Sequence, residues 1–155
     1  QVDEIARLCG TTGVGHVINN AYGLQCSRTC RLVNRAMAVG RVDAIVQSTD
    51  KNFMVPVGGA LVCGPNQAFI DKVGKSYAGR ASMGPCLDLF MTLLSMGESG
   101  LRRMLSHREG LVDEFRRQFR ACAQANGERL LETPANTISF AMTLTTQGGQ
   151  VRLFI

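Results

Sequence analysis

The sequence lacks the features that would place it in a membrane or mark it for secretion. It has no run of about 18 apolar residues, which predicts no membrane span. Its first four residues, QVDE, have neither the basic start nor the apolar core of a signal peptide. Internal repeats and low-complexity segments are absent as well. We therefore expect one ordinary globular chain that does not contact a membrane.

The sequence also lacks the cysteine patterns of metal sites. No CxxC motif and no cysteine–histidine pair at zinc spacing occurs, so we expect no metal. Only Cys26 and Cys30 are close, one helical turn apart. Scattered cysteines of this kind are typical of reduced cytosolic thiols and small core residues. The six are at positions 9, 26, 30, 63, 86 and 122.

What is present indicates a folded domain with a mild positive charge. The 155 residues are 45% hydrophobic and 19% charged, which suits one globular domain. The formal net charge is +5, from 17 Lys and Arg against 12 Asp and Glu. This balance is compatible with a polyanionic partner such as nucleic acid, but alone it is weak evidence for one.

Hydrophobic periodicity predicts alternating helices and strands, hence an α/β fold. We expect the helix at 82–96 to be buried because it is apolar on all sides. A linker at 133–136 is the expected domain boundary and separates residues 1–132 from 133–155. The predicted helices are 2–8, 24–38, 67–73, 82–96 and 101–125, and the predicted strands are 16–18, 43–48, 58–63, 129–132 and 137–144.

Lys51 lies in a polar, bent stretch between two apolar runs, 44–46 and 60–63. Both runs are short and rich in branched residues, which is typical of buried strands. A flexible amine at the end of a buried strand loses hydration, and this favours its neutral, nucleophilic form. A lysine that binds a cofactor covalently needs that situation. The pattern leaves a second interpretation open, a solvated loop lysine before an ordinary hairpin.

Two further places offer candidate site residues. Asn19 and Asn20 follow a predicted strand, and open α/β sheets bind ligands at such strand ends. The pair is equally typical of a simple turn. Arg80 follows Gly79 in a loop before a helix, and its guanidinium fork matches phosphate or carboxylate. The alternative for Arg80 is an ion pair at a helix start, where a cation opposes the helix dipole.

Six segments, in order along nearly the whole chain, resemble one family. They are similar to segments of the O-phosphoseryl-tRNA(Sec):selenocysteinyl-tRNA synthases, also called O-phosphoseryl-tRNA(Sec) selenium transferases. The resemblance weakens after about residue 146. The segments are HVINNAYG (16–23), VGRVDA (39–44), QSTDKNFMVPVGG (47–59), GRAS (79–82), NGERLL (126–131) and AMTL (141–144).

The resemblance implies a fold and a reaction. The fold would be that of a fold type I pyridoxal-phosphate-dependent transferase. Residues 1–132 would be the later part of its large domain and 133–155 the start of its small C-terminal domain. The family works in the cytoplasm as a homotetramer on tRNA(Sec) that carries O-phosphoserine. Phosphate is eliminated, a dehydroalanyl group remains on the tRNA, and selenophosphate supplies selenium to give selenocysteinyl-tRNA(Sec).

The resemblance also implies roles for particular residues. Lys51 would hold pyridoxal 5′-phosphate and act as the catalytic base. Ser48 and Asn52, which flank this lysine in the sequence, are further candidates for contact with the cofactor. Asn19 would face the pyridine nitrogen, where an amide makes a weaker electron sink than a carboxylate. Arg80 would bind the phosphoserine substrate. A basic tRNA-contacting residue of the family is replaced here by alanine at position 38, which leaves Arg35 and Arg41 as the candidates for tRNA contact.

Two alternatives stay open. The chain could come from another fold type I enzyme, such as a phosphoseryl-tRNA(Cys) sulfur transferase or an amino-acid lyase. It could instead be a non-catalytic interaction fragment, for example an antigenic or truncated product. The family's phosphate cup for the cofactor and other substrate-binding residues would lie upstream of residue 1. We therefore expect the isolated segment to be inactive.

Overall fold

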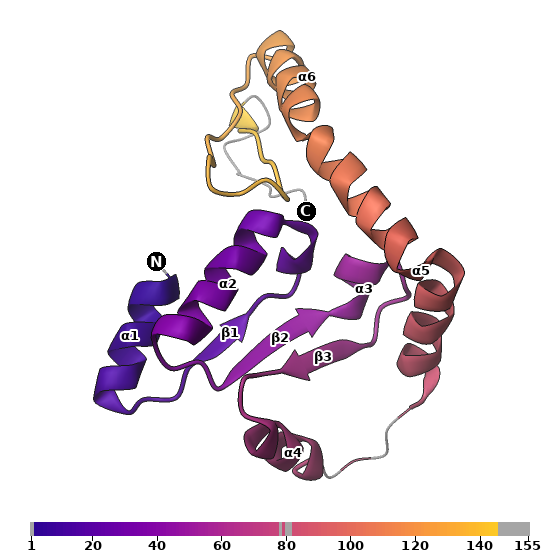
Figure 1. Cartoon of the computed structure of the whole chain (residues 1–155). Helices are drawn as coiled ribbons and strands as arrows, with labels where there is room; N and C mark the ends of the chain where they lie inside the picture. Colours follow the sequence, from indigo (N-terminus) through magenta and orange to yellow (C-terminus); the bar gives the residue numbers. More distant parts are fainter. Residues whose placement is uncertain (1, 78, 80–81, 146–155) are drawn as a thin grey trace. The chain divides into compact units, whose positions relative to one another are not determined.

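The structure is a computed structural model, and it describes residues 2–77, 79 and 82–145 (Figure 1). The chain divides into two compact units, Gln1–Glu98 and Ser99–Ile155. The division falls next to Gly97, whose φ of 63° and ψ of 172° interrupt helix α5 (Gly84–Gly110). This interruption confirms the break that the sequence predicts at 97–100. The predicted domain boundary at 133–136 stays a prediction about a longer protein.

The first unit opens with two helices and two parallel strands. Helix α1 (Val2–Thr12) leads to β1 (Val17–Asn19), and the 3₁₀ turn η1 (Gly23–Gln25) and α2 (Ser27–Val39) lead to β2 (Ala44–Ser48). Strands β1 and β2 are parallel, with Val17 opposite Ala44. A helical crossover is the usual way to join parallel neighbours. The predicted strand–helix–strand order is confirmed.

Strand β3 (Ala60–Cys63) completes a three-stranded sheet in the order β1-β2-β3. It runs antiparallel to β2, with Val46 opposite Val62. The chain therefore returns after the lysine segment as the sequence predicts. That segment is not an open loop, because it contains the short helix α3 (Thr49–Phe53). Helix α4 (Gln67–Lys75) follows β3.

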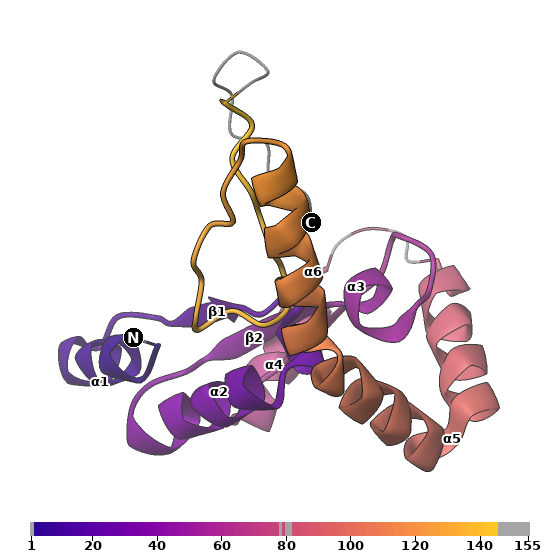
Figure 2. The same ribbon diagram turned by 90° about the horizontal axis from the view of Figure 1, so that it is seen from above.

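The core lies where α1 and α2 pack against β1 and β2 (Figure 2). Gly40 allows the close approach of α1, because a Cβ at that position would lie 2.3 Å from the carbonyl oxygen of Ala6. The Arg41 N–H donates to that same oxygen at 2.8 Å. The buried side chains of this core are Ala6, Ile18, Val33, Ala36, Val42 and Ile45.

Two predictions of burial are wrong for this chain. All four residues of β3 are exposed. The helix predicted to be buried at 82–96 corresponds to the first part of α5, where Phe90 is 61% and Leu94 is 71% exposed. An all-round apolar pattern shows that a helix can be buried, but the described residues supply no layer that covers it. Within those residues, no helix is both long and apolar enough to cross a membrane.

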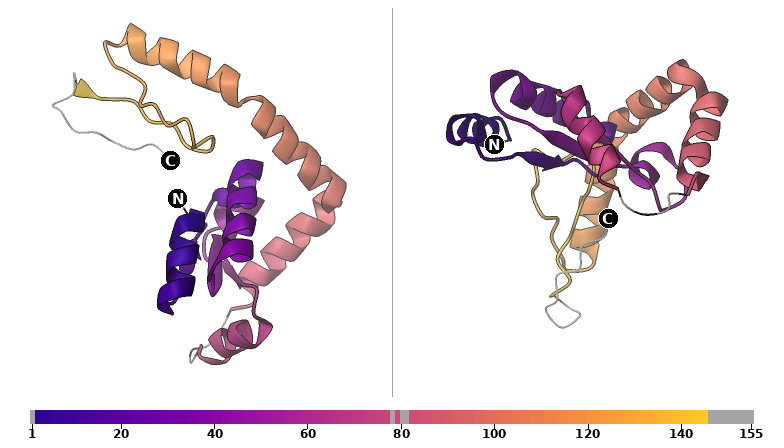
Figure 3. Two further views of the ribbon diagram at one scale, coloured as in Figure 1. Left: turned by 60° about the vertical axis from the view of Figure 1, so that its left-hand side comes forward. Right: turned by 90° about the horizontal axis from the view of Figure 1, so that it is seen from below.

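The second unit consists of the rest of α5, α6 (Val112–Ala125) and the segment after it (Figure 3). The predicted single helix over 101–125 is interrupted at Leu111, between α5 and α6. It ends as predicted at Asn126, followed by Gly127 with φ of 70°. The prediction of strands at 129–132 and 137–144 is wrong, because these segments do not form a continuous ladder of hydrogen bonds. The described residues there form one isolated bridge, between Leu130 and Met142.

Side chains of α5 and α6 hold that last segment in place. The Phe140 ring lies 5.1 Å from the ring of Phe115, measured between centroids. The Arg116 guanidinium lies over Phe140 at 5.4 Å. Arg108 donates through both of its terminal nitrogens to the carbonyl of Thr137, at 3.2 and 3.4 Å. Aromatic and cation–π contacts take the place of a strand ladder here.

Candidate active site

The candidate site lies at the carboxyl ends of β1 and β2. Because the two strands are parallel, the residues that follow them leave at the same edge of the sheet, where open α/β sheets bind ligands. Two backbone hydrogen bonds keep the turn after β1 beside β2. Asn20 N donates to Val46 O at 2.9 Å, and Ser48 N donates to Ala21 O at 3.1 Å.

Lys51 follows the end of β2 by three residues and lies in α3. Its Nζ is 3.1 Å from Asp50 Oδ2 and 3.5 Å from Ser48 Oγ. The side chain is 44% exposed, so the expected burial of the amine is not found. Strand β2 does end at the lysine segment as predicted, but β3 is too exposed to enclose that segment.

The backbone around Lys51 is held from three sides. Gln25 Nε2 donates to the Lys51 carbonyl at 2.5 Å. The buried Asn52 amide donates to Ala21 O at 2.8 Å and to Ser48 O at 2.6 Å. Thr49 N and Oγ1 both donate to Gly59 O, at 3.1 and 2.8 Å. The lysine backbone is therefore fixed while its side chain extends toward solvent.

Asp50 and Gln25 are site residues that the sequence reasoning missed. The Ser48 hydroxyl donates to Asp50 Oδ1. This hydrogen bond first, and the Lys51 ammonium second, hold the pKa of the Asp50 carboxyl below its usual value. The signal in the sequence was the short spacing of three polar residues, Ser48, Asp50 and Lys51. Gln25 gave no such signal, because it is 26 positions from Lys51.

Asn19 ends β1, on the strand next to the one that delivers Lys51. Its side chain is exposed, and its Oδ1 accepts from Ala21 N at 3.2 Å. Gly23 N donates to Asn20 O at 3.1 Å. These bonds form the turn that the alternative interpretation describes. The predicted contact of Asn19 with a cofactor stays a prediction, because in this structure Oδ1 accepts a hydrogen bond within the turn.

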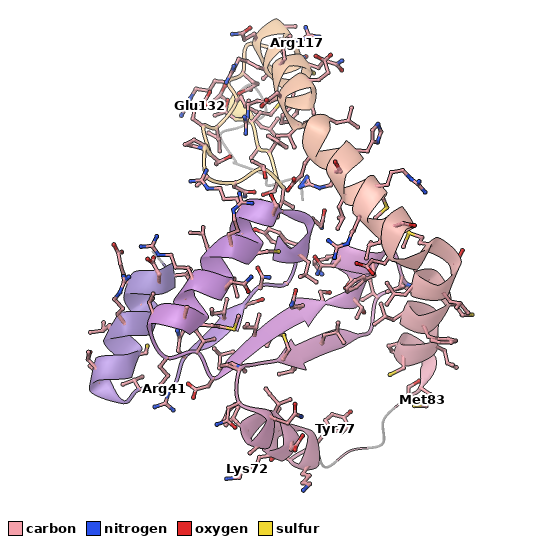
Figure 4. The ribbon with its side chains drawn as sticks, in the orientation of Figure 1. Arg41, Lys72, Tyr77, Met83, Arg117 and Glu132 are labelled. Atoms are coloured by element: carbon pink, nitrogen blue, oxygen red, sulfur yellow. The ribbon has the colours of Figure 1, made fainter. Side chains whose placement is uncertain are left out.

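The basic candidates do not gather at this edge. Arg41, labelled in Figure 4, precedes β2, whereas Lys51 follows that strand. Its Nε lies 3.0 and 2.9 Å from the two carboxylate oxygens of Asp43, and Nη1 donates to Gly13 O at 2.6 Å. Arg35 pairs with Asp3 at 3.1 Å. Arg80 is outside the described residues.

The arrangement fits a small cofactor that a primary amine can hold covalently. Lys51 presents that amine, partly exposed, at the ligand-binding edge of the sheet. Asn52 Oδ1 beside it is buried, and among the described residues it has no hydrogen-bond partner. A buried acceptor without a partner is costly in a native protein and is often completed by a bound group or water. The same residues offer no cluster of three or more metal-ligating side chains.

Comparison with solved structures places the fold in a class. The chain matches a crystal structure of archaeal O-phosphoseryl-tRNA(Sec) selenium transferase with a TM-score of 0.84 and 29% sequence identity. The match covers 92% of this chain and 32% of that one. It confirms the predicted class, an α/β fold of the kind that fold type I transferases have.

Sequence comparison then gives the family. A model of the family "O-phosphoseryl-tRNA(Sec) selenium transferase, SepSecS" matches residues 1–153, and the chain belongs to this family. It is 50% identical over 147 residues to the O-phosphoseryl-tRNA(Sec) selenium transferase of Dictyostelium discoideum. It is 44% identical over 145 residues to that of Caenorhabditis elegans.

The chain spans about a third of the length of these relatives. The matches cover 94% of this chain in both cases, but 31% of the Dictyostelium protein and 30% of the Caenorhabditis protein. The family assignment therefore rests on one segment.

Proposed function

We propose that this chain is a segment of a pyridoxal-phosphate-dependent transferase that converts O-phosphoseryl-tRNA(Sec) to selenocysteinyl-tRNA(Sec). Selenophosphate is the selenium donor. The single observation that carries the proposal is the family match over residues 1–153. It is supported by the position of Lys51, whose amine lies at the carboxyl edge of two parallel strands.

Each candidate residue has its own role in the proposed reaction. Pyridoxal phosphate, when bound, supplies an electron sink to the reacting carbon. Lys51 would hold the cofactor through its amine, and the same amine, when free, would take the proton from the substrate Cα. Ser48 and Asn19 orient the cofactor through their hydroxyl and amide groups. Arg80 binds the phosphate of the phosphoseryl group through its guanidinium fork.

The reaction then needs a leaving group and a donor. Loss of the Cα proton to Lys51 allows the β-phosphate to leave and a dehydroalanyl group to remain on the tRNA. The selenium of selenophosphate then bonds to the β-carbon of that group and a proton returns to Cα. Water cleaves the phosphorus–selenium bond, so phosphate leaves and selenocysteinyl-tRNA(Sec) remains. An amide at Asn19, rather than a carboxylate, suffices because phosphate is a good leaving group.

In this proposal, the whole protein binds the same partners as other members of its family. It is a cytoplasmic homotetramer that binds tRNA(Sec), and residues 1–132 belong to its large domain and 133–155 to its small one. Arg35 and Arg41 contact the tRNA. Both guanidiniums are paired with acids of this chain, at 3.1 Å for Arg35–Asp3 and 2.9 Å for Arg41–Asp43. Phosphates would therefore have to compete with Asp3 and Asp43 for them.

The decisive experiment traps the cofactor on its lysine. The full-length protein is incubated with pyridoxal phosphate, reduced with borohydride and digested, and the modified peptide is identified by mass spectrometry. The wild type and Lys72→Ala should carry the reduced cofactor at residue 51, and Lys51→Ala should carry none there. Lys72 is a fair control because it lies on the exposed helix α4 (Figure 4).

The alternatives give different results. No fixed cofactor in the wild type would refute the enzyme and favour a non-catalytic interaction fragment. Fixed cofactor with turnover of phosphoseryl-tRNA(Cys) and sulfide, or of a free amino acid, would indicate another fold type I enzyme. Turnover that requires both phosphoseryl-tRNA(Sec) and selenophosphate is the outcome that we expect.

A further inference from the structure

One carboxylate, Asp50, contacts the Lys51 amine directly. Asp50 Oδ2 is 3.1 Å from Lys51 Nζ. The Ser48 hydroxyl donates to the other carboxylate oxygen, Oδ1, and is itself 3.5 Å from Lys51 Nζ. The amine thus lies against two oxygen-bearing side chains, both from the turn at the end of β2.

Adjacency in the sequence does not explain this contact. Neighbouring side chains in a helix do not face each other. The chain contains a second Asp–Lys pair, Asp71 and Lys72, in α4. There Asp71 accepts a hydrogen bond from Gln67 at 2.8 Å, and within the described part of the chain it forms no ion pair with Lys72. Ser48 is what orients the Asp50 carboxylate toward its neighbour.

The Asp50 carboxylate is also less exposed than its partner. Its side chain is 15% exposed, against 44% for Lys51. A carboxylate that is partly shielded and oriented by a hydroxyl is a better fixed point for an ammonium than an ordinary surface acid, because less side-chain freedom is lost in forming the pair.

We propose that Asp50, oriented by Ser48, is a positioning residue that holds the free amine of Lys51 beside the end of β2. The inference rests on the proposed function, in which Lys51 alternates between holding the cofactor and standing free. To attach, the amine must leave Asp50 and lose its charge. When it stands free and has taken a proton at Nζ, it is a cation that Asp50 stabilises. Asp50 therefore favours the free state of Lys51.

The test uses a readout that does not depend on turnover. The full-length protein, freed of cofactor, is treated with a trace of acetic anhydride, and acetylation of each lysine is quantified by mass spectrometry. Residues 1–155 contain three lysines, and Lys72 and Lys75 serve as internal standards for Lys51. Because the ion pair holds Nζ against the side chains of Asp50 and Ser48, loss of the pair should leave the amine more accessible to the reagent and speed labelling of Lys51.

Four variants make the comparison specific. Asp50→Asn should raise the labelling of Lys51, relative to Lys72 and Lys75, by about two- to five-fold, the range expected for a partly exposed ion pair. Asp50→Glu should restore a low ratio. Ser48→Ala should give a smaller rise, because the carboxylate remains but is no longer oriented. Asp71→Asn, the matched control, should leave the Lys51 ratio unchanged.

The outcomes separate this inference from the proposed function. An unchanged ratio in Asp50→Asn, or an equal rise in Asp71→Asn, overturns the role of Asp50 even if borohydride traps cofactor on Lys51. A wild type that traps no cofactor overturns the proposed function, and the labelling ratio then reports only on the contact between Asp50 and Lys51. A rise confined to Asp50→Asn and Ser48→Ala, with cofactor trapped on Lys51, supports both.

Discussion

Two stretches of the first unit are both rich in apolar residues and differ in what surrounds them. Residues 2–55, with α1, β1, α2, β2 and α3, bury a core of six side chains. Residues 60–98, with β3, α4 and the first part of α5, have no buried residue among those described. Strands β2 and β3 are hydrogen-bonded neighbours, yet Ile45 of β2 is 4% exposed and Val62 of β3 is 39% exposed.

The difference shows that an apolar pattern in the sequence does not by itself mean that the side chains are buried. The pattern states which face of an element can leave water, whereas burial requires a second element that covers that face. Strand β2 has its cover in α1 and α2, which the same stretch of sequence provides. The candidate site lies at the end of β2, so Lys51 follows the strand that is packed against helices and not the exposed strand β3.

The largest expected effect contrasts the two strands directly. Ile45→Ala should destabilise this chain by about 2–5 kcal/mol, because it leaves a cavity in the core. Val62→Ala removes methyl groups that are already partly in water and should cost less than about 1 kcal/mol. Urea unfolding of both variants measures the free energies. Equal costs would mean that β3 is covered as well as β2.

The next effect tests the close approach of α1 to the C-terminal end of α2, at Gly40. Gly40→Ala should cost about 1–3 kcal/mol, because its Cβ would overlap the backbone of Ala6. Gly74→Ala in α4 meets nothing within 4 Å and should stabilise by about 0.5–1 kcal/mol. The measurement is again urea unfolding. If Gly40→Ala were neutral, α1 would not pack as described.

A smaller effect depends on pH. Asp43 accepts from Arg41 and from His16 N at 2.7 Å, and these bonds lower the pKa of its carboxyl from 3.8. A lowered pKa in the folded state means stability that is present above about pH 4 and is lost as the pH falls through the folded value. Asp43→Asn should cost about 1 kcal/mol at pH 7 and flatten the loss of stability below pH 4.

Unfolding curves measured from pH 2 to pH 7 check this prediction. Asp71→Asn is the control, since Asp71 lies on the exposed helix α4 and its carboxylate accepts only from Gln67 among the described residues. An equally steep loss of stability with acid in Asp43→Asn and the wild type would contradict the role given to Asp43.

The smallest effect belongs to the exposed stretch. Leu94→Gln in α5 should change the stability of this chain by about 0.5 kcal/mol or less, because the side chain is 71% exposed. Thermal unfolding of the chain is the measurement. A cost comparable to that of Ile45→Ala would show that this face of α5 is covered in solution, and would remove the contrast between the two stretches.

Much of the site's framework could be predicted from the sequence. The order of helices and strands, the end of β2 before Lys51 and the return of the chain in β3 follow from local periodicity and turn residues. The resemblance added the family, which the comparisons confirm. Local signals suffice for these features because the residues that produce them lie within one element or one turn.

Tertiary structure decided the rest. The contact of Gln25 with the Lys51 carbonyl, the bond from Arg41 to the Gly13 carbonyl, and the exposure of β3 and α5 depend on which surfaces meet. The pairing of Asp50 with Lys51 is local, but it depends on the orientation of two side chains, which periodicity does not describe. Periodicity describes one element at a time, whereas burial and hydrogen-bond partners are set by the distances between elements.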